Sequence, residues 1–347
     1  MTWQKSNIFL GCDPEIFVTA ENELFPAYKF LPPKQEAKLF NGVYTNARVF
    51  WDGFQAEFSL SETPCVAHVV DGIREGLRGV HELARLNNPT AKLTTRNVFQ
   101  IPVKTLRSEK EEFVMLGCNP SQNVYGMLGE DVFDARKLRY RFAGGHIHFG
   151  ISKFNFTREE NESFVRALDA ILGVWSVGAA ANFDNPIRRK YYGLAGEYRL
   201  PKHGLEYRTL SNFWITHPGL ANLVLMFARA VFGFWRSGLA KNWVAHPQEV
   251  VETINNCDVK TARKLLEINR PALEEVFSNM SNLNVFHPKV TEVQEAIRIG
   301  LDGLESVIPD PENFEQNWKL NYGSGWGGHA EGKMESWKEL CQIKLAA

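Results

Sequence analysis

The chain has 347 residues, of which 44% are hydrophobic and 23% are charged, a composition typical of a globular protein. Its formal net charge is -1 at pH 7, which gives no general electrostatic reason to bind nucleic acid or an anionic membrane. The N-terminal residues have no long apolar run and no small-residue cleavage site, so no signal peptide is predicted. Five cysteines without CxxC spacing indicate neither a disulfide framework nor a cysteine zinc site, and they predict reduced cytoplasmic thiols.

Alternating polarity predicts strands in the N-terminal part of the chain. In residues 7–18 the apolar side chains share one face, whereas Asp13 and Glu15 lie on the other. Residues 54–60 alternate in the same way, with Glu57 among the polar positions. Residues 65–86 then carry apolar side chains at helical spacing.

The segment 141–151, RFAGGHIHFGI, places two histidines in an apolar run. His146 and His148 are two residues apart, so on a strand they share a face that points away from the core. Gly144 and Gly145 leave room beside them for a ligand or for a close backbone approach. Taken alone, the pair is also consistent with surface or hydrogen-bonded histidines.

The remaining elements are mainly helical. Residues 157–181 begin with a threonine cap and early glutamates, and residues 197–211 predict a strand-loop-strand unit around PKHG. Further helices are expected at 218–240, 247–256, 258–280 and 290–306, with breaks at Asp258 and Pro271.

The segment 218–240 is apolar enough to suggest a membrane span. Asn222, Arg229 and Arg236 interrupt it, and such side chains are costly inside a bilayer. A buried or half-buried core helix is therefore predicted, and no membrane association is expected.

These elements predict an α+β fold: an antiparallel or mixed sheet, helices on one face, and a helical C-terminal third. We expect one domain over residues 1–308, sheet-rich in 1–215 and helical in 216–308. Residues 309–347 are predicted to be a C-terminal extension with a glycine-rich loop at 321–333. A glycine-rich loop can bind phosphate, but the GxxxxGK[ST] pattern is absent from the sequence.

The polar faces of four predicted strands carry mainly carboxylates, imidazoles and guanidiniums, where a solvated sheet face would normally carry lysine, threonine and serine as well. Carboxylates packed together would repel one another and raise their pKa values, and a divalent cation removes that penalty. Carboxylate oxygens with an imidazole suit Mg²⁺ or Mn²⁺ better than a structural zinc site. The predicted metal ligands are Asp13, Glu15, Glu57, His146, His148 and Glu206.

Arginines accompany these acids. Two EYR triplets contain Arg199 and Arg208, and Arg188 precedes them. Guanidinium groups bind phosphate or carboxylate with two hydrogen bonds, so these arginines predict a polyanionic substrate or cofactor. Metal with arginine is also the usual equipment for phosphoryl transfer. The alternative is that each arginine pairs with Glu197 or Glu206 within the sheet.

Four motifs, GCDPEIF, DGFQAEFSL, AGGHIHFGI and GEYRLPKHGLEYRTLSNFW, occur in this order over residues 7–215. The set resembles the phage COOH.NH2 ligase family (type 2 amidoligases), which belongs to the glutamine synthetase and glutamate–cysteine ligase fold group. The resemblance implies an ATP-dependent enzyme that joins a carboxylate to an amine. It also implies a curved, mainly antiparallel sheet, with helices on its convex face and a concave face that binds ATP and two or three divalent metals.

The resemblance assigns roles residue by residue. Asp13 and Glu15 resemble the first acidic pair, often E-x-E, so the aspartate is a departure. Glu57 resembles the second acidic ligand, with Asp52 as an additional candidate. In the later motifs, His146 resembles the metal-binding histidine and His148 its partner, Glu206 the last metal carboxylate, and Arg199 and Arg208 the phosphate-binding arginines, with Arg188 a further candidate for cofactor binding.

The implied reaction has two steps, in which a carboxylate attacks ATP to give an acyl phosphate and an amine then displaces phosphate. The partners would be a carboxylate and an amine, each a small molecule, a peptide or a protein, in the host cytoplasm if a bacteriophage encodes the chain. A metal-dependent hydrolase, a guanidino phosphotransferase of the same fold group and a catalytically silent viral binding protein stay open as alternatives. A homo-oligomer is also open, because members of the fold group often oligomerise.

Overall fold

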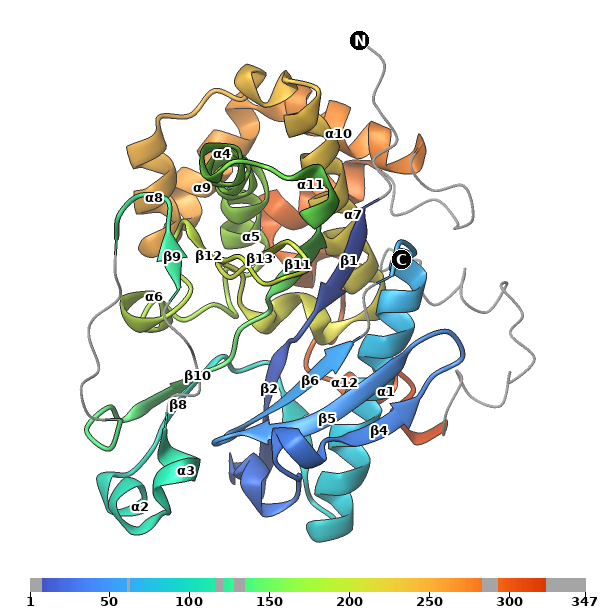
Figure 1. The fold of residues 1–347 in the computed structure, drawn as a ribbon, viewed down its shortest axis with the longest axis vertical. Helices are drawn as coiled ribbons and strands as arrows, with labels where there is room; N and C mark the ends of the chain where they lie inside the picture. The colour runs from blue at the N-terminus through green and yellow to red at the C-terminus, as the bar shows by residue number, and fades with distance from the viewer. Residues whose placement is uncertain (1–7, 61–62, 116–120, 128–134, 283–292, 323–347) are drawn as a thin grey trace.

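The computed structural model describes residues 8–60, 63–115, 121–127, 135–282 and 293–322 (Figure 1). The described strands all lie before residue 208, and the described elements after residue 216 are helices. The pairings between neighbouring strands in the described residues are antiparallel. The predicted α+β class, with a helical C-terminal region, is therefore confirmed.

One sheet contains the histidine strand, β11 (Ile147–Gly150), as an inner strand between β1 (Phe9–Cys12) and β13 (Leu205–Tyr207). Its five strands have the order β1, β11, β13, β12 (Glu197–Arg199) and β9 (Gln122–Asn123). The predicted strand-loop-strand unit around PKHG is the β12–β13 hairpin.

A second sheet is formed largely by the N-terminal part of the chain. Its order is β3 (Glu23–Leu24), β2 (Glu15–Ala20), β6 (Gln55–Leu60), β5 (Asn46–Asp52) and β4 (Lys38–Asn41), and β7 (Lys92–Thr94) also pairs with β2. A separate ribbon pairs β8 (Val98–Gln100) with β10 (Tyr140–Phe142).

The expected single curved sheet is thus divided. Strands β1 and β2 are consecutive in the sequence but belong to different sheets (Figure 1). Asp13 and Pro14 separate the two strands. Proline has no N–H group, so it cannot continue a strand ladder. The histidine segment is divided as well, because β10 ends at Phe142 and β11 begins at Ile147. Between them, Gly144 forms an isolated bridge with Ser211.

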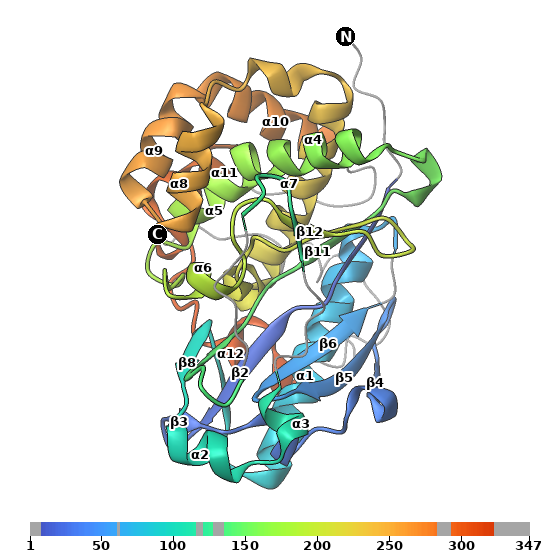
Figure 2. The same ribbon diagram turned by 60° about the vertical axis from the view of Figure 1, so that its left-hand side comes forward.

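Helix α1 (Val66–Asn87) packs against β4, β5 and β6, and α7 (Pro218–Arg236) packs against α1. Most of α7 is buried, which confirms the predicted core helix, although its length and composition would also suit a membrane span. A group of helices gathers at one end of the molecule, away from β4 and β5, whereas α12 lies near α1 (Figures 1 and 2). The helices in this end are α4 (Arg158–Leu168), α5 (Val174–Ala179), α8 (Pro247–Asn255), α9 (Val259–Ile268), α10 (Arg270–Asn282) and α11 (Val293–Asp302).

The shorter helices include α2 (Val103–Ser108), α3 (Glu111–Val114), α6 (Arg188–Tyr191) and α12 (Phe314–Asn317). The predicted helix 258–280 is two helices, α9 and α10, which meet at Asn269. Asp258 caps α9 by accepting a hydrogen bond from the N–H of Thr261 at 3.0 Å. The glycine-rich segment 321–333 lies outside the described residues, apart from its first two positions.

One hydrophobic core joins the strands to the helices. Ile147 and Phe149 of β11 are fully buried in it, so His148, between them, points to the opposite side of the strand. This confirms the predicted separation of an apolar back from an ionisable front. The ionisable front lies where the two sheets meet.

Candidate active site

The first of two ionisable clusters is the imidazole cluster, formed by Asp13, His146, His148 and Glu206. Oδ1 of Asp13 lies 3.0 Å from Nε2 of His148 and 3.2 Å from Nδ1 of His146. The same His146 nitrogen lies 3.6 Å from Oε1 of Glu206. Residues from three separate parts of the chain therefore meet within hydrogen-bonding or ion-pairing distance.

Strand register explains this convergence. His148 is directly opposite Glu206 of β13 on one side and opposite Gly11 of β1 on the other. Gly11 has no side chain to cover the histidine. Asp13 follows the end of β1, so the break at Pro14 places its carboxylate beside both imidazoles.

The second group, the carboxylate cluster, consists of Glu15, Asp52 and Glu57. Glu15 of β2 is paired directly with Glu57 of β6, and Asp52 ends the neighbouring strand β5. One ligand oxygen from each of the three lies within 4.8 Å of the others. Glu15 is 3% exposed and Glu57 is 8% exposed, so neither carboxylate can rely on bulk water to stabilise its charge.

The carboxylate cluster favours protonated acids when no cation is present. Burial, together with the charge of Asp52, raises the pKa of Glu15 to about 8. Burial and the charge of Asp13 raise the pKa of Glu57 well above its usual value. Burial also raises the pKa of Asp52. Three acids that resist ionisation together are the arrangement that a divalent cation stabilises.

In the imidazole cluster the carboxylates are instead stabilised in their ionised form. Burial alone would raise the pKa of Asp13, but attraction to His148 and hydrogen bonds with both imidazoles lower it well below its usual value. Burial similarly opposes ionisation of Glu206, whereas His146 and Arg208 lower its pKa. Burial and the charge of Arg208 lower the pKa of His146 to about 4. Ionised carboxylates beside a neutral imidazole form a suitable ligand set for a cation.

The predicted arginines separate into two groups. Nη1 of Arg208 pairs with Oε1 of Glu206, and Nη1 of Arg199 lies 3.7 Å from the same oxygen. Arg188 lies elsewhere: it is fully buried and donates to the main-chain oxygens of Thr209 and Leu210. Arg188 was predicted to contact a cofactor. In the structure its guanidinium is instead bound by backbone carbonyls in the protein interior.

Tyr192 connects the two clusters, although the sequence interpretation gave it no role. Its hydroxyl contacts Nε2 of His146 and lies 3.3 Å from Oε2 of Glu15. A Cβ at Gly144 would lie 2.6 Å from that hydroxyl oxygen and equally close to His146 Nε2. Gly144 is therefore required for this contact, and its N–H also donates to Oε2 of Glu15 at 2.6 Å. The glycine that precedes the histidines is the sequence feature that indicates a close contact at this position.

Two further residues, His203 and Lys34, contact the clusters, although the sequence patterns assigned them no role. His203, in the PKHG turn, lies with Nε2 3.0 Å from Nδ1 of His148. Lys34 lies with its ammonium nitrogen 3.4 Å from Oε1 of Glu57. Burial alone would lower the pKa of Lys34, but Glu57 and the nearby aspartates raise it. No periodic pattern marked Lys34, because it lies in a short turn, Lys34–Glu36, outside the strands.

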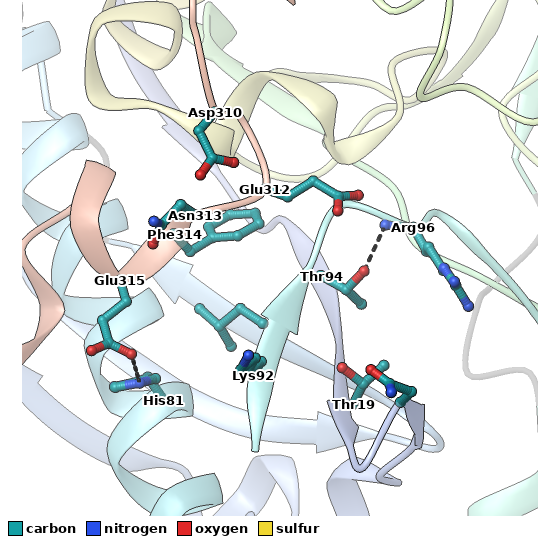
Figure 3. A pocket seen from close by; sticks show the side chains of 12 residues that line it. Thr19, His81, Lys92, Thr94, Arg96, Asp310, Glu312, Asn313, Phe314 and Glu315 are labelled. Carbon is teal, nitrogen blue, oxygen red and sulfur yellow. Dashed lines mark hydrogen bonds and ion pairs between the residues drawn. The ribbon is translucent and has the colours of Figure 1, made fainter. Parts of the chain in front are cut away.

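A cavity of about 530 Å³ lies apart from both clusters (Figure 3). Its walls come from β7, α1 and the segment around α12, and Glu315 points toward His81 at 3.4 Å (Figure 3). The described residues that line it include none of the predicted site residues. Its location therefore does not identify the chemical site, which the clustered acids and imidazoles mark instead.

The chemistry of the donors tests whether divalent cations fit. Asp13, His148 and Glu206 each offer one ligand atom, and these atoms lie within 4.8 Å of one another, as do those of the carboxylate cluster. Oxygen ligands alone suit Mg²⁺, and oxygen ligands with one imidazole suit Mn²⁺ as well as Mg²⁺. The residues thus fit two cations better than one closed structural zinc site.

Comparison with known proteins gives two findings. No curated protein matches the chain. A family model described as "Phage phiEco32-like COOH.NH2 ligase-type 2" matches residues 134–299. The matched region contains both imidazoles, Tyr192, His203 and the β12–β13 hairpin with its arginines, whereas Asp13, Glu15, Asp52 and Glu57 precede it. The match over residues 134–299 bears out the resemblance to this carboxylate–amine ligase family and covers the last two of the four motifs.

Proposed function

We propose that this protein is an ATP-dependent carboxylate–amine ligase that forms an amide through an acyl-phosphate intermediate. The observation that carries the proposal is the meeting of the two clusters at the junction of the two sheets, joined by the contacts of Tyr192 with His146 and Glu15. Asp13, His146, His148 and Glu206 would hold one cation, and Glu15, Asp52 and Glu57 would hold another. Bound cations would neutralise phosphate charge.

The arginines would act on the transferred phosphoryl group. Arg199 is partly exposed beside Glu206, so it can reach a ligand at the front of the sheet. Arg208 is 1% exposed and is fixed by Glu206 and by the ring of Tyr192, whose centroid lies 5.3 Å from the guanidinium carbon. A guanidinium held in place before the reaction can stabilise charge that develops in the transition state without reorganising.

The substrates follow from this reaction class. The carboxylate attacks the γ-phosphorus of ATP and ADP leaves; the amine then attacks the acyl carbon and inorganic phosphate leaves. The amine must lose a proton as the amide forms. Both partners can be small molecules, peptides or protein side chains, and the cytoplasm remains the predicted location.

A trapping assay with hydroxylamine tests the proposal. The full-length protein would be incubated with ATP, Mg²⁺, hydroxylamine and a panel of carboxylates, and both hydroxamate and ADP would be measured. We expect at least one carboxylate to yield the two products in equal amounts. Binding of ATP with Mg²⁺ should also raise the unfolding temperature, since a ligand that binds the folded state stabilises it.

The same assay separates the competing functions. A hydrolase would respond to the metal but not to ATP, and a guanidino phosphotransferase would yield a phosphorylated guanidine without hydroxamate. The absence of both carboxylate-dependent ADP release and stabilisation by ATP with Mg²⁺ would contradict the ligase proposal.

A further inference from the structure

The turn between β12 and β13 places a second imidazole directly behind His148. Nε2 of His203 lies 3.0 Å from Nδ1 of His148, and the rings stack with centroids 5.1 Å apart. The other ring nitrogen of His148, Nε2, lies 3.0 Å from Oδ1 of Asp13. One nitrogen of His148 therefore faces the carboxylates and the other faces His203.

The main chain fixes His203 in this place. Its carbonyl oxygen accepts a hydrogen bond from the N–H of Ser152 at 3.2 Å, just beyond the end of β11. Gly204 follows with a φ of 150°, a conformation that favours glycine. A Cβ at Gly204 would lie 2.1 Å from the main-chain oxygen of Phe149. The sequence His-Gly thus allows the turn to lie against β11 and brings the ring to His148.

The chemistry of imidazole gives this contact a consequence. A neutral imidazole that binds a cation through one nitrogen carries its proton on the other. For His148, whose side chain is only 16% exposed, binding through Nε2 requires the proton to lie on Nδ1. A largely buried N–H group needs an acceptor, and outer partners of this kind orient metal-binding histidines. Nε2 of His203 lies at the right distance to accept.

We propose that His203 is a positioning residue for the cation site. Its Nε2 accepts the Nδ1–H of His148 and so holds the tautomer and ring orientation in which Nε2 of His148 binds a divalent cation. His203 itself does not touch the cation. This inference rests on the proposed function, because it assumes that the imidazole cluster binds a divalent cation.

Mn²⁺ binding to the full-length protein without nucleotide tests the inference, with the electron paramagnetic resonance signal of free Mn²⁺ as the readout. His203→Phe keeps a ring that can stack but removes the acceptor, whereas His203→Gln keeps an acceptor near the position of Nε2. We expect His203→Phe to lose about 10- to 100-fold in Mn²⁺ affinity, as for other outer-shell substitutions. His203→Gln should bind close to wild type, and the exposed neighbour Lys202→Gln is the matched control.

The outcomes separate the two proposals. Wild-type affinity in His203→Phe, or equal losses in the Phe and Gln variants, would overturn the role of His203 while leaving cation binding intact. Failure of the wild-type protein to bind Mn²⁺ would overturn the cation sites of the proposed function, and this inference with them. Circular dichroism reports whether each variant folds, and His203→Leu replaces the Phe variant in the same comparison if that variant does not fold.

Discussion

Glu15 of β2 and Glu57 of β6 are direct partners across two antiparallel strands. Like charges at directly opposed strand positions destabilise a sheet. Burial, with the charge of Asp52, raises the pKa of Glu15, and burial, with the charge of Asp13, raises the pKa of Glu57, so each carboxyl group keeps its proton more strongly than in water. A cation bound between the two carboxylates would offset the free-energy cost of burying them together.

The first prediction concerns this pair. Glu57→Gln removes one of the two opposed charges, so the metal-free variant should unfold at a higher temperature than wild type at pH 8, and it should bind Mn²⁺ at least about tenfold more weakly. Calorimetry and Mn²⁺ titration measure the two effects. The exposed Glu36→Gln is the control. Unchanged Mn²⁺ affinity in Glu57→Gln would remove Glu57 from the ligand set.

Lys34 and a divalent cation should compete for Glu57. The Lys34 ammonium lies 3.4 Å from Oε1 of Glu57, and its side chain is 67% exposed. Exposed ion pairs contribute about 0.2–1 kcal/mol, so Lys34→Met should strengthen Mn²⁺ binding without nucleotide by up to about fivefold. Lys38→Met, in the exposed edge strand β4, should leave the affinity unchanged. Weaker Mn²⁺ binding in Lys34→Met would contradict this competition.

Arg208→Lys tests charge stabilisation with little change in total charge. Lysine keeps the positive charge but lacks the planar guanidinium, whose Nη1 pairs with Glu206. Hydroxamate formation should fall by about 10²–10³-fold, as for other fixed charge stabilisers. The exposed Arg48→Lys is the control. If both Arg208→Ala and Glu206→Ala retain full ATP-dependent ligation, these two residues do not act in the reaction.

Tyr192→Phe isolates one hydroxyl group. That group contacts both His146 and Glu15, so its loss should weaken Mn²⁺ binding about tenfold through the orientation of the two side chains. Tyr191→Phe is a close control, because the ring of Tyr191 stacks on Phe142 rather than on the clusters. Equal effects of the two substitutions on Mn²⁺ affinity would show that general packing, and not the Tyr192 hydroxyl, is responsible.

Asp169 predicts a pH dependence of stability that is separate from the clusters. Burial raises its pKa from 3.8 to about 7, although Tyr207 donates a hydrogen bond to it at 2.7 Å. The folded protein therefore keeps a proton that the unfolded chain has lost, and this contribution to stability is complete below pH 3.8 and is lost as the pH rises through about 7.

Asp169→Asn should therefore reduce the fall in unfolding free energy between pH 4 and 7, with the difference in slope approaching about 1.4 kcal/mol per pH unit. Urea titrations of both proteins across this range measure the slopes. Parallel curves for wild type and Asp169→Asn would contradict the raised pKa of Asp169.

Local sequence patterns predicted the elements well where one periodicity dominated. The helix expected at 65–86 is α1, and the strand around Glu57 is β6. The same alternation placed His148 opposite a buried apolar face, as the full burial of Ile147 and Phe149 confirms. The alternating pattern predicted one continuous strand through Pro14. Because proline lacks an N–H group, the strand is interrupted there, and β1 and β2 lie in different sheets.

The sequence by itself determined which side chains face the front of each strand, because the two-residue period of a strand fixes that choice locally. Only the tertiary structure decided which of these side chains meet. Asp13 reaches His146 across 133 residues because β1 pairs with β11, and Arg188 is directed to backbone carbonyls because the chain folds over it. Tyr192 and His203 lie on connecting segments without a period, so their contacts depend on strand order and turn geometry, which long-range packing sets.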